Sequence, residues 1–172
     1  VKLFIPDIIS EHSFRAVGSR NPQRSARSNA NCLRNKITKI LKSGEVDSEK
    51  FTFIDWKAEV EVCPNYSDRL KEIETLYNTS DEFHKDAVQN TQMALNSLAL
   101  TRRGHHQIQN VDIEEGARYI VKELAFLAAV PKIYTAFTKY RFVYHKDWPL
   151  VTNFFAGSYD GIKRPCFEFF VL

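Results

Sequence analysis

The sequence lacks any long apolar run, and its longest one covers only residues 124–130. A helix that crosses a bilayer needs about 20 such residues. A glycine-rich phosphate-binding loop is also missing, so the sequence does not support the binding of ATP through such a loop. We therefore expect no association with a membrane and no nucleotide cofactor.

Cysteine is scarce, and the three that occur, Cys32, Cys63 and Cys166, show no CxxC spacing and cannot all pair. This usage suits a reducing cytoplasm better than an oxidising compartment, and we expect no structural zinc site. His105 and His106 could bind a metal, but no third ligand lies near them, and a polar loop is the alternative. We expect a cytoplasmic protein without a bound metal.

The chain has 172 residues, of which 44% are hydrophobic, and this suffices for one domain with a substantial core. No linker or internal repeat divides it, so the prediction is a single domain over residues 1–172. Val1 lies directly in a strand-like run, which leads us to expect a further segment upstream of it.

Apolar periodicity predicts strands that alternate with helices. Strands are expected at residues 1–6, 51–56, 141–145 and 166–172, and helices at residues 22–43, 66–77, 79–103 and 112–129, with a short one that follows Pro149 and stops at Gly157. Thr79 with Glu82 resembles a capping box, Pro131 is expected to end the fourth helix, and residues 104–111 are typical of a loop. This alternation predicts an α/β fold with a mostly parallel sheet flanked by helices.

The helix expected at residues 22–43 is apolar on one side and basic on the other. The apolar stripe, which should face the sheet, comprises Ala26, Ala30, Leu33, Ile37, Ile40 and Leu41. The basic side comprises Arg24, Arg27, Arg34, Lys39 and Lys42, with Arg20 extending the row ahead of the helix. No acidic residue occurs between Phe14 and Gly44, and an unrelieved row of like charges weakens a helix by repulsion. The net charge of +3 proves nothing alone, but this row favours RNA or another phosphate backbone over a solvated face.

An acidic residue, Glu123, lies within an apolar helical segment. Tyr119, Glu123 and Phe126 are at i, i+4 and i+7 and therefore share one helix face. The apolar neighbours predict that Glu123 is at least partly buried, which is costly unless a cation or hydrogen bonds compensate. A substrate ammonium could be that cation. The alternative is an ordinary surface glutamate on an amphipathic helix.

Tyr144 and His145 end the strand expected at residues 141–145. In open α/β sheets, ligands bind at the carboxyl ends of the strands. A tyrosine phenol can relay a proton, and a histidine that titrates near neutrality can orient or assist it. The alternative is that the two side chains only pack and form hydrogen bonds there.

The order and spacing of these pieces resemble the cyclodipeptide synthase family over essentially the whole chain. The segment Tyr119-Ile-Val-Lys-Glu123-Leu-Ala-Phe is similar to the family's Tyr-x-x-x-Glu-Leu-Pro-Phe pattern, and Tyr144-His145 matches the next motif. Further matching pieces follow in family order at residues 4–7, 16–18, 31–35, 54–56, 83–91 and 131–133. Ala125 stands where the family commonly has proline, and neither residue carries a functional group.

The family holds its nucleophilic serine in a Gly-x-Ser-x-x-Asn turn after a first strand, and this chain begins beyond that turn. The segment Gly18-Ser19-Arg20-Asn21 has a different spacing and follows the strand end at Pro6, where the family has an ordinary turn. We therefore reject Ser19 as the nucleophile. The resemblance implies that an upstream segment, not included in this sequence, supplies the serine.

The resemblance implies a Rossmann-like domain similar to the catalytic domain of class I tyrosyl- and tryptophanyl-tRNA synthetases. The HIGH and KMSKS signatures of those enzymes are absent, so no ATP chemistry, metal or other cofactor is expected. Two aminoacyl-tRNAs would be the substrates in a ping-pong scheme. The serine takes the first aminoacyl group, reaction with the second aminoacyl-tRNA gives a dipeptidyl-enzyme, and cyclisation releases a diketopiperazine.

The same resemblance implies roles for the candidate residues. Tyr119 and Glu123 would hold the ammonium of the first aminoacyl group, and Glu123 would also take part in proton transfer. Tyr144, oriented by His145, would relay protons or stabilise charge during cyclisation. Two aromatic residues would line an apolar pocket for the first amino-acid side chain: Phe126 and Phe142.

Two rival functions are compatible with the same residues. A catalytically inactive tRNA-binding protein of this fold would share the basic helix but form no product. A degenerate class I tRNA synthetase domain would bind ATP, against which the missing signatures weigh. In each case the expected partner is tRNA, and neither DNA nor a membrane is expected.

Overall fold

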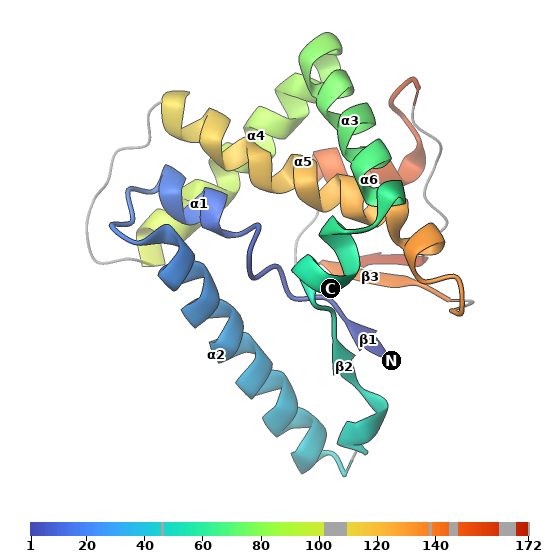
Figure 1. Ribbon diagram of the computed structural model, residues 1–172. Coiled ribbons are helices and arrows are strands. Elements are labelled where there is room, and N and C mark those ends of the chain that lie inside the picture. The colour runs from blue at the N-terminus through green and yellow to red at the C-terminus, as the bar shows by residue number, and fades with distance from the viewer. Residues whose placement is uncertain (46, 102–109, 138, 145–147, 162–167, 172) are drawn as a thin grey trace.

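The computed structural model describes residues 1–172 except 46, 102–109, 138, 145–147, 162–167 and 172 (Figure 1). In chain order the elements are β1 (Lys2–Leu3), α1 (Glu11–Ala16), α2 (Pro22–Ser43), the 3-10 turn η1 (Ser48–Lys50), β2 (Thr52–Phe53), the π-helical turn η2 (Trp56–Glu61), α3 (Pro64–Thr79), α4 (Asp81–Thr101), α5 (Asn110–Ile133), β3 (Arg141–Tyr144), α6 (Pro149–Ala156) and β4 (Glu168–Val171). Within the described part of the chain, no helix is both long and apolar enough to cross a bilayer.

The strands form two parallel pairs. β1 pairs with β2 in the register Leu3↔Phe53, and β3 pairs with β4 in the register Tyr144↔Val171. Parallel neighbours need a crossover connection, and α1 with α2 supplies it for the first pair while α6 lies between the strands of the second. The predicted α/β fold with parallel strands is confirmed.

β1 and β2 are shorter than the predicted strands 1–6 and 51–56. Pro6 has no backbone N–H for a strand ladder. Asp55 accepts a hydrogen bond from the backbone N–H of Ala58 at 3.0 Å, and this cap begins η2 directly after β2. The prediction that Trp56 belongs to a strand is therefore wrong, because its segment has turned into a helical conformation.

The start of α4 differs from the predicted capping box at Thr79. Ser80 is the capping residue, since its Oγ accepts a hydrogen bond from the backbone N–H of Phe83 at 3.3 Å. Thr79 instead donates its hydroxyl to the carbonyl of Thr75 in the last turn of α3. The cap of α4 is therefore one residue later than the sequence predicts.

The ends of α5 also differ from the prediction. The helix begins at Asn110, so Asn110 and Val111 are not part of the predicted loop, and the rest of that loop lies outside the described residues. Pro131 does not end the helix, which continues to Ile133. A proline in the last turn removes only one backbone hydrogen bond, so the turn around it can persist.

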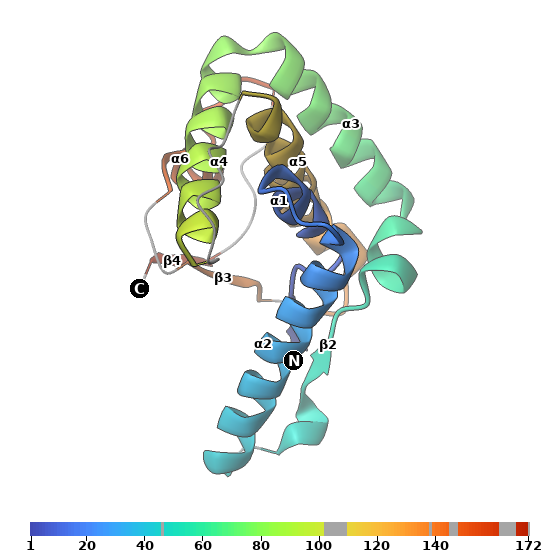
Figure 2. The same ribbon diagram turned by 90° about the vertical axis from the view of Figure 1, so that its left-hand side faces the viewer.

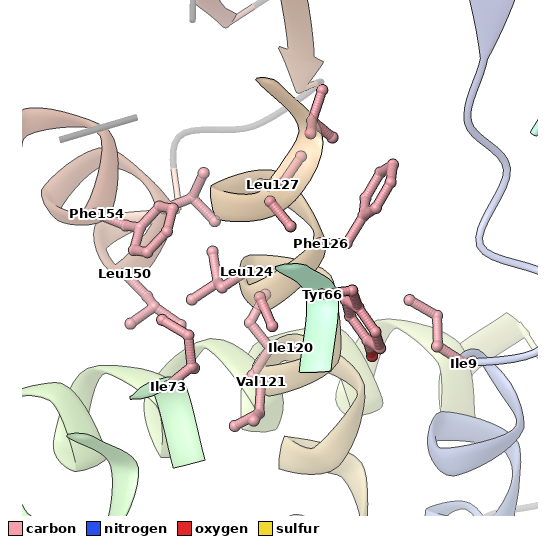
Figure 3. Close-up of a cluster of buried hydrophobic side chains, with 14 of the residues drawn as sticks. Ile9, Tyr66, Ile73, Ile120, Val121, Leu124, Phe126, Leu127, Leu150 and Phe154 are labelled. Atoms are coloured by element: carbon pink, nitrogen blue, oxygen red, sulfur yellow. The ribbon is translucent and has the colours of Figure 1, made fainter. Parts of the chain in front are cut away.

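The core surrounds α5, against which α1, α3 and α4 pack. Figure 3 shows Ile120, Leu124 and Leu127 of α5 among the side chains of Ile73 from α3 and Leu150 from α6, and all are buried. These contacts hold α5 as the central helix of the fold. The turn that carries Glu123 therefore lies on a rigid element.

A glycine allows α4 to approach α5 closely. A Cβ at Gly116 would lie 2.8 Å from Leu95 Cδ1 and 2.9 Å from Thr91 Cγ2, which is closer than side-chain packing permits. Any larger residue at this position would have to displace the side chains of Leu95 and Thr91.

α2 extends away from the core in both views (Figures 1 and 2). Its first turns bury Ala26 and Ala30 beside α1, whereas Leu33 and Ile40 are exposed. The prediction that the apolar stripe faces a sheet is therefore wrong, because its buried part packs on α1 and because Leu33 and Ile40 are exposed. Helix periodicity identifies which side chains share a face, but the distal half of this helix has too few neighbours to bury them.

Candidate active site

α5 places Tyr119 and Glu123 one turn apart on one face, as the sequence predicts. The Tyr119 hydroxyl donates a hydrogen bond to Glu123 Oε1 at 2.8 Å. Glu123 is only 5% exposed, and its neighbours Val121 and Leu124 are buried apolar residues. The prediction of a buried carboxylate is confirmed, and the alternative of a surface glutamate is wrong.

The phenol of Tyr119 acts as a permanent hydrogen-bond donor in this pair. Burial raises the pKa of Tyr119 well above its ordinary value, and the charge of Glu123 together with the hydrogen bond raises it further. Tyr119 therefore stays protonated throughout the physiological pH range. A carboxylate and a phenol oxygen held in this way can both accept hydrogen bonds from an ammonium group.

Aromatic side chains from the ends of β1 and β2 lie beside the following turn of α5. The ring of Phe126, which is 2% exposed, lies 4.7 Å from that of Phe4 and 5.4 Å from that of Trp56. Phe4 follows β1 directly, and Trp56 follows β2 after two residues. The carboxyl ends of this parallel pair thus meet the helix that carries Tyr119 and Glu123, which is where open α/β sheets bind ligands.

Tyr144 ends β3 as predicted, and Phe142 lies two residues earlier in the same strand. Both pair with residues of the parallel strand β4, Tyr144 with Val171. His145 lies outside the described residues. The convergence of Tyr144 and His145 with Glu123 stays a prediction.

The basic residues of α2 divide into an open row and one paired arginine. The exposed members are Arg20, Arg24, Arg27, Lys39 and Lys42. Arg34 is different, because its Nη2 donates to Asp7 Oδ2 at 2.7 Å and its guanidinium lies 5.8 Å from the centre of the Phe53 ring. Arg34 therefore ties α2 to the segment after β1, whereas the sequence placed it on the free basic face.

The open face of α2 carries a shallow depression of about 710 Å³. Its lining combines two arginines with neutral polar side chains: Asn21, Gln23, Arg24, Arg27, Ser28, Asn31, Cys32 and Asn35. One helix face lines all of it, on an element other than the one that carries Glu123. Guanidinium and amide donors on such an open surface suit the phosphate oxygens of an extended polyanion better than an enclosed small substrate.

No described residues gather into a set of three or more side chains that could hold a metal ion. Cys32 and Cys63 carry free thiols, while His105, His106 and Cys166 lie outside the described residues.

Among the described residues, the sequence did not predict several contacts between distant segments, and two of them bear on the site. One is the ion pair of Arg34 with Asp7, for which the acidic residue after a strand end was the available signal. The other joins His12 of α1 to Glu115 of α5 at 2.9 Å. α1 has only six residues, too few to show a helical period, so the sequence offered no signal for His12.

Comparison with known proteins identifies a family for this arrangement. A family model described as cyclodipeptide synthase matches residues 1–165. No curated protein matches the chain. The family match covers α2, the Tyr119–Glu123 turn and β3.

Solved structures of cyclodipeptide synthases share the fold. One from Staphylococcus haemolyticus is 19% identical, with a TM-score of 0.72 over 95% of this chain and 71% of its own. One from Bacillus thermoamylovorans is 15% identical, with a TM-score of 0.76 over 95% and 70%. One from Streptomyces noursei is 18% identical, with a TM-score of 0.69 over 99% and 78%. The Rossmann-like fold expected from the sequence is therefore confirmed.

Proposed function

The chain belongs to the cyclodipeptide synthase family, and on this premise we propose that the Tyr119–Glu123 pair is its aminoacyl-binding centre. The family consists of aminoacyltransferases that make cyclic dipeptides from aminoacyl-tRNAs, and the chain is an enzyme of this kind. The observation that carries the proposal is the buried carboxylate with its 2.8 Å phenol hydrogen bond. The test is a comparison of the wild type and Glu123→Gln in cyclodipeptide formation from charged tRNAs.

The proposed centre recognises the α-ammonium that every aminoacyl ester carries. The carboxylate of Glu123 supplies the opposite charge, and the Tyr119 oxygen supplies a second acceptor at a fixed position. Both side chains project from consecutive turns of the central helix α5, so substrate binding requires little reorganisation of either. The amino group is thereby held whatever side chain the amino acid has.

The serine first takes an aminoacyl group from tRNA. In each of the two following steps we propose that an amine attacks an ester and forms an amide bond. The amine of this aminoacyl group attacks the ester of the second aminoacyl-tRNA, and the second tRNA leaves with its hydroxyl restored. The amine of the second residue then attacks the seryl ester, which closes the ring and frees the serine. Each attack releases a proton, for which we propose Glu123 in the first case and Tyr144 with His145 in the second.

We propose that Phe126 and Phe142 line the pocket for the first amino-acid side chain, as the family resemblance implies. Phe126 supports this assignment because it lies three residues after Glu123, within the aromatic group of Phe4 and Trp56. An apolar amino acid suits such surroundings. We also propose the cytoplasm as the place of the reaction, since charged tRNAs are found there.

The nucleophile is proposed to be a serine of a segment that is not part of this sequence. Ser19 follows α1, and its Oγ lies 2.9 Å from the Oγ of Ser25 in the first turn of α2. In the full gene product, Ser19→Ala should still form an acyl-enzyme with aminoacyl-tRNA, measured by intact-protein mass spectrometry. Loss of the acyl-enzyme in Ser19→Ala, together with its retention after replacement of every upstream serine, would make Ser19 the nucleophile.

We propose that the open basic face of α2 binds the phosphates of tRNA. Arg27→Ala should weaken binding of every tRNA alike, because phosphate contacts position the nucleic acid without reading its sequence. The slope of log affinity against log salt should fall by roughly one unit through the lost release of a counterion. Filter binding of uncharged tRNA over a salt series measures both quantities.

Arg34→Ala is the matched control for Arg27→Ala. Its guanidinium is engaged by Asp7, so we expect an unchanged salt slope and a loss of about 1 kcal/mol in the free energy of unfolding. If Arg27→Ala binds tRNA with the affinity and slope of the wild type, the face of α2 is merely solvated. If Arg34→Ala lowers the slope, its ion pair does not keep it from the nucleic acid.

A further inference from the structure

A polar network joins α1 to α5 on both sides of Tyr119. His12 Nδ1 lies 2.9 Å from Glu115 Oε1, and His12 Nε2 lies 2.9 Å from Lys122 Nζ. Arg15 also donates to Glu115 Oε1, at 2.5 Å. The His12 side chain is only 7% exposed. Both ring nitrogens of a buried histidine are thus engaged by residues two turns apart on one helix.

These partners fix the hydrogen position on His12. A carboxylate only accepts hydrogen bonds and an ammonium only donates them, so Nδ1 carries the hydrogen and Nε2 is the acceptor. Burial lowers the pKa of His12, the hydrogen bond to Glu115 opposes this, and the charge of Lys122 lowers the pKa further. The neutral imidazole satisfies both contacts, whereas a protonated ring would turn an N–H towards the ammonium of Lys122.

The network spans the turn that carries the aminoacyl-binding centre. Glu115, Tyr119 and Lys122 are at i, i+4 and i+7 and share one face of α5, and Glu123 is the next residue. α1 packs against this part of α5 (Figure 1). Loss of these contacts removes the polar link that fixes this face of α5 against α1, and a displacement of about 1 Å in a reacting group can cost about 100-fold in rate.

We propose that His12 is a positioning residue, whose neutral imidazole bridges Glu115 and Lys122 and thereby holds Tyr119 and Glu123 in place for the reaction. This inference rests on the proposed function of that pair. It also implies an acid limit, because protonation of His12 breaks the contact with Lys122. His12 itself does not contact the substrate or transfer a proton in this proposal.

The charged groups that act on His12 come from the two helices that form the network: Glu11 of α1, and Glu115 and Lys122 of α5. Arg15 and Arg118 lie one step further away and pair with Glu115. Among the described residues, α2, which also packs on α1, contributes no hydrogen bond or ion pair to His12. Burial alone would raise the pKa of Glu115, but the hydrogen bonds from His12 and Arg15 lower it below its ordinary value. Glu115 therefore stays ionised while His12 titrates.

The sign of the pH effect follows from the lowered pKa of His12. The folded state favours the neutral ring, so the stabilisation is fully present above the unfolded pKa of about 6.5 and is lost as the pH falls through the lower folded value. The acid limit should accordingly lie below pH 6.5, in the range where Glu115 is still a carboxylate.

The test compares His12→Leu with His12→Gln in the full gene product. Leucine removes both contacts, while the glutamine amide keeps one donor and one acceptor and does not titrate. The rate of cyclodipeptide formation is measured from about pH 5 to 8, with tRNA affinity in parallel. We expect His12→Leu to be about 10-fold slower with unchanged tRNA affinity. We expect His12→Gln to restore most of the rate and to lose less of it on acidification than the wild type does.

A His12→Leu protein with the rate and pH profile of the wild type would overturn the proposal. So would a His12→Gln protein as slow as His12→Leu, or one that loses as much of its rate on acidification as the wild type does. A second measurement needs no turnover: an NMR titration of the histidines should show a higher pKa for His12 in Lys122→Met, because a nearby cation is gone. An unchanged pKa of His12 in Lys122→Met would refute the contact between His12 and Lys122. A wild type that forms no cyclodipeptide would instead refute the proposed function.

Discussion

Glu123→Gln is expected to lower the rate of cyclodipeptide formation by about 100-fold or more, in line with losses of charge binding and acid–base catalysis. The amide has nearly the shape of the carboxylate and can still accept the hydrogen bond from Tyr119. The charge that meets the substrate ammonium is lost, and so is the proposed proton acceptor. Thermal unfolding should change little, so the loss of rate cannot be explained by a failure to fold.

Glu114→Gln is the matched control for this substitution. Glu114 lies on the same helix but is 58% exposed, and it accepts a hydrogen bond from the Tyr77 hydroxyl. Its variant should form product at a rate within about twofold of the wild type, since exposed charges contribute little. Near-normal product formation by Glu123→Gln, measured by liquid chromatography and mass spectrometry, would remove Glu123 from the mechanism.

Phe126→Ala should lower the free energy of unfolding by about 3–5 kcal/mol. The ring is almost fully buried and packs between Phe4 and Trp56, so its removal takes apolar area from the core and leaves a cavity. This loss is a large part of the roughly 5–15 kcal/mol that stabilise a typical domain. Equilibrium unfolding in urea, followed by circular dichroism, gives the difference.

Phe137→Ala is the control for the loss of a phenyl ring. Phe137 lies beyond the end of α5 and is 38% exposed, so its removal should lower the free energy of unfolding by about 1 kcal/mol or less. If Phe126→Ala were as stable as Phe137→Ala, the ring of Phe126 would not be enclosed by the strand ends. Its place beside the aminoacyl-binding centre would then be wrong.

The sequence could predict relations within one helix. Tyr119 and Glu123 share a face because four residues make about one helical turn, and the apolar residues around them made burial one of two open outcomes. The limits of α2 were likewise predicted from its apolar periodicity. Such inferences depend on local geometry that the rest of the chain does not alter.

Relations between elements were harder to predict, because they depend on how helices pack. The helical periodicity of α2 predicted that Arg34 lies on the basic face. In the structure, Arg34 instead forms an ion pair with Asp7, which follows β1. The same periodicity could not show that Leu33 and Ile40 are exposed and do not pack in the core. The role proposed for His12 could be inferred only from the packing of α1 against α5. Tertiary packing decides these cases, and no local period encodes it.

The most direct test of the central claim is to incubate the full gene product with two charged tRNAs and to identify the products by mass spectrometry. Our account predicts a cyclic dipeptide formed without added ATP or metal, together with deacylated tRNA. Binding of the charged tRNAs without a cyclic product, or a product that depends on ATP, would contradict it.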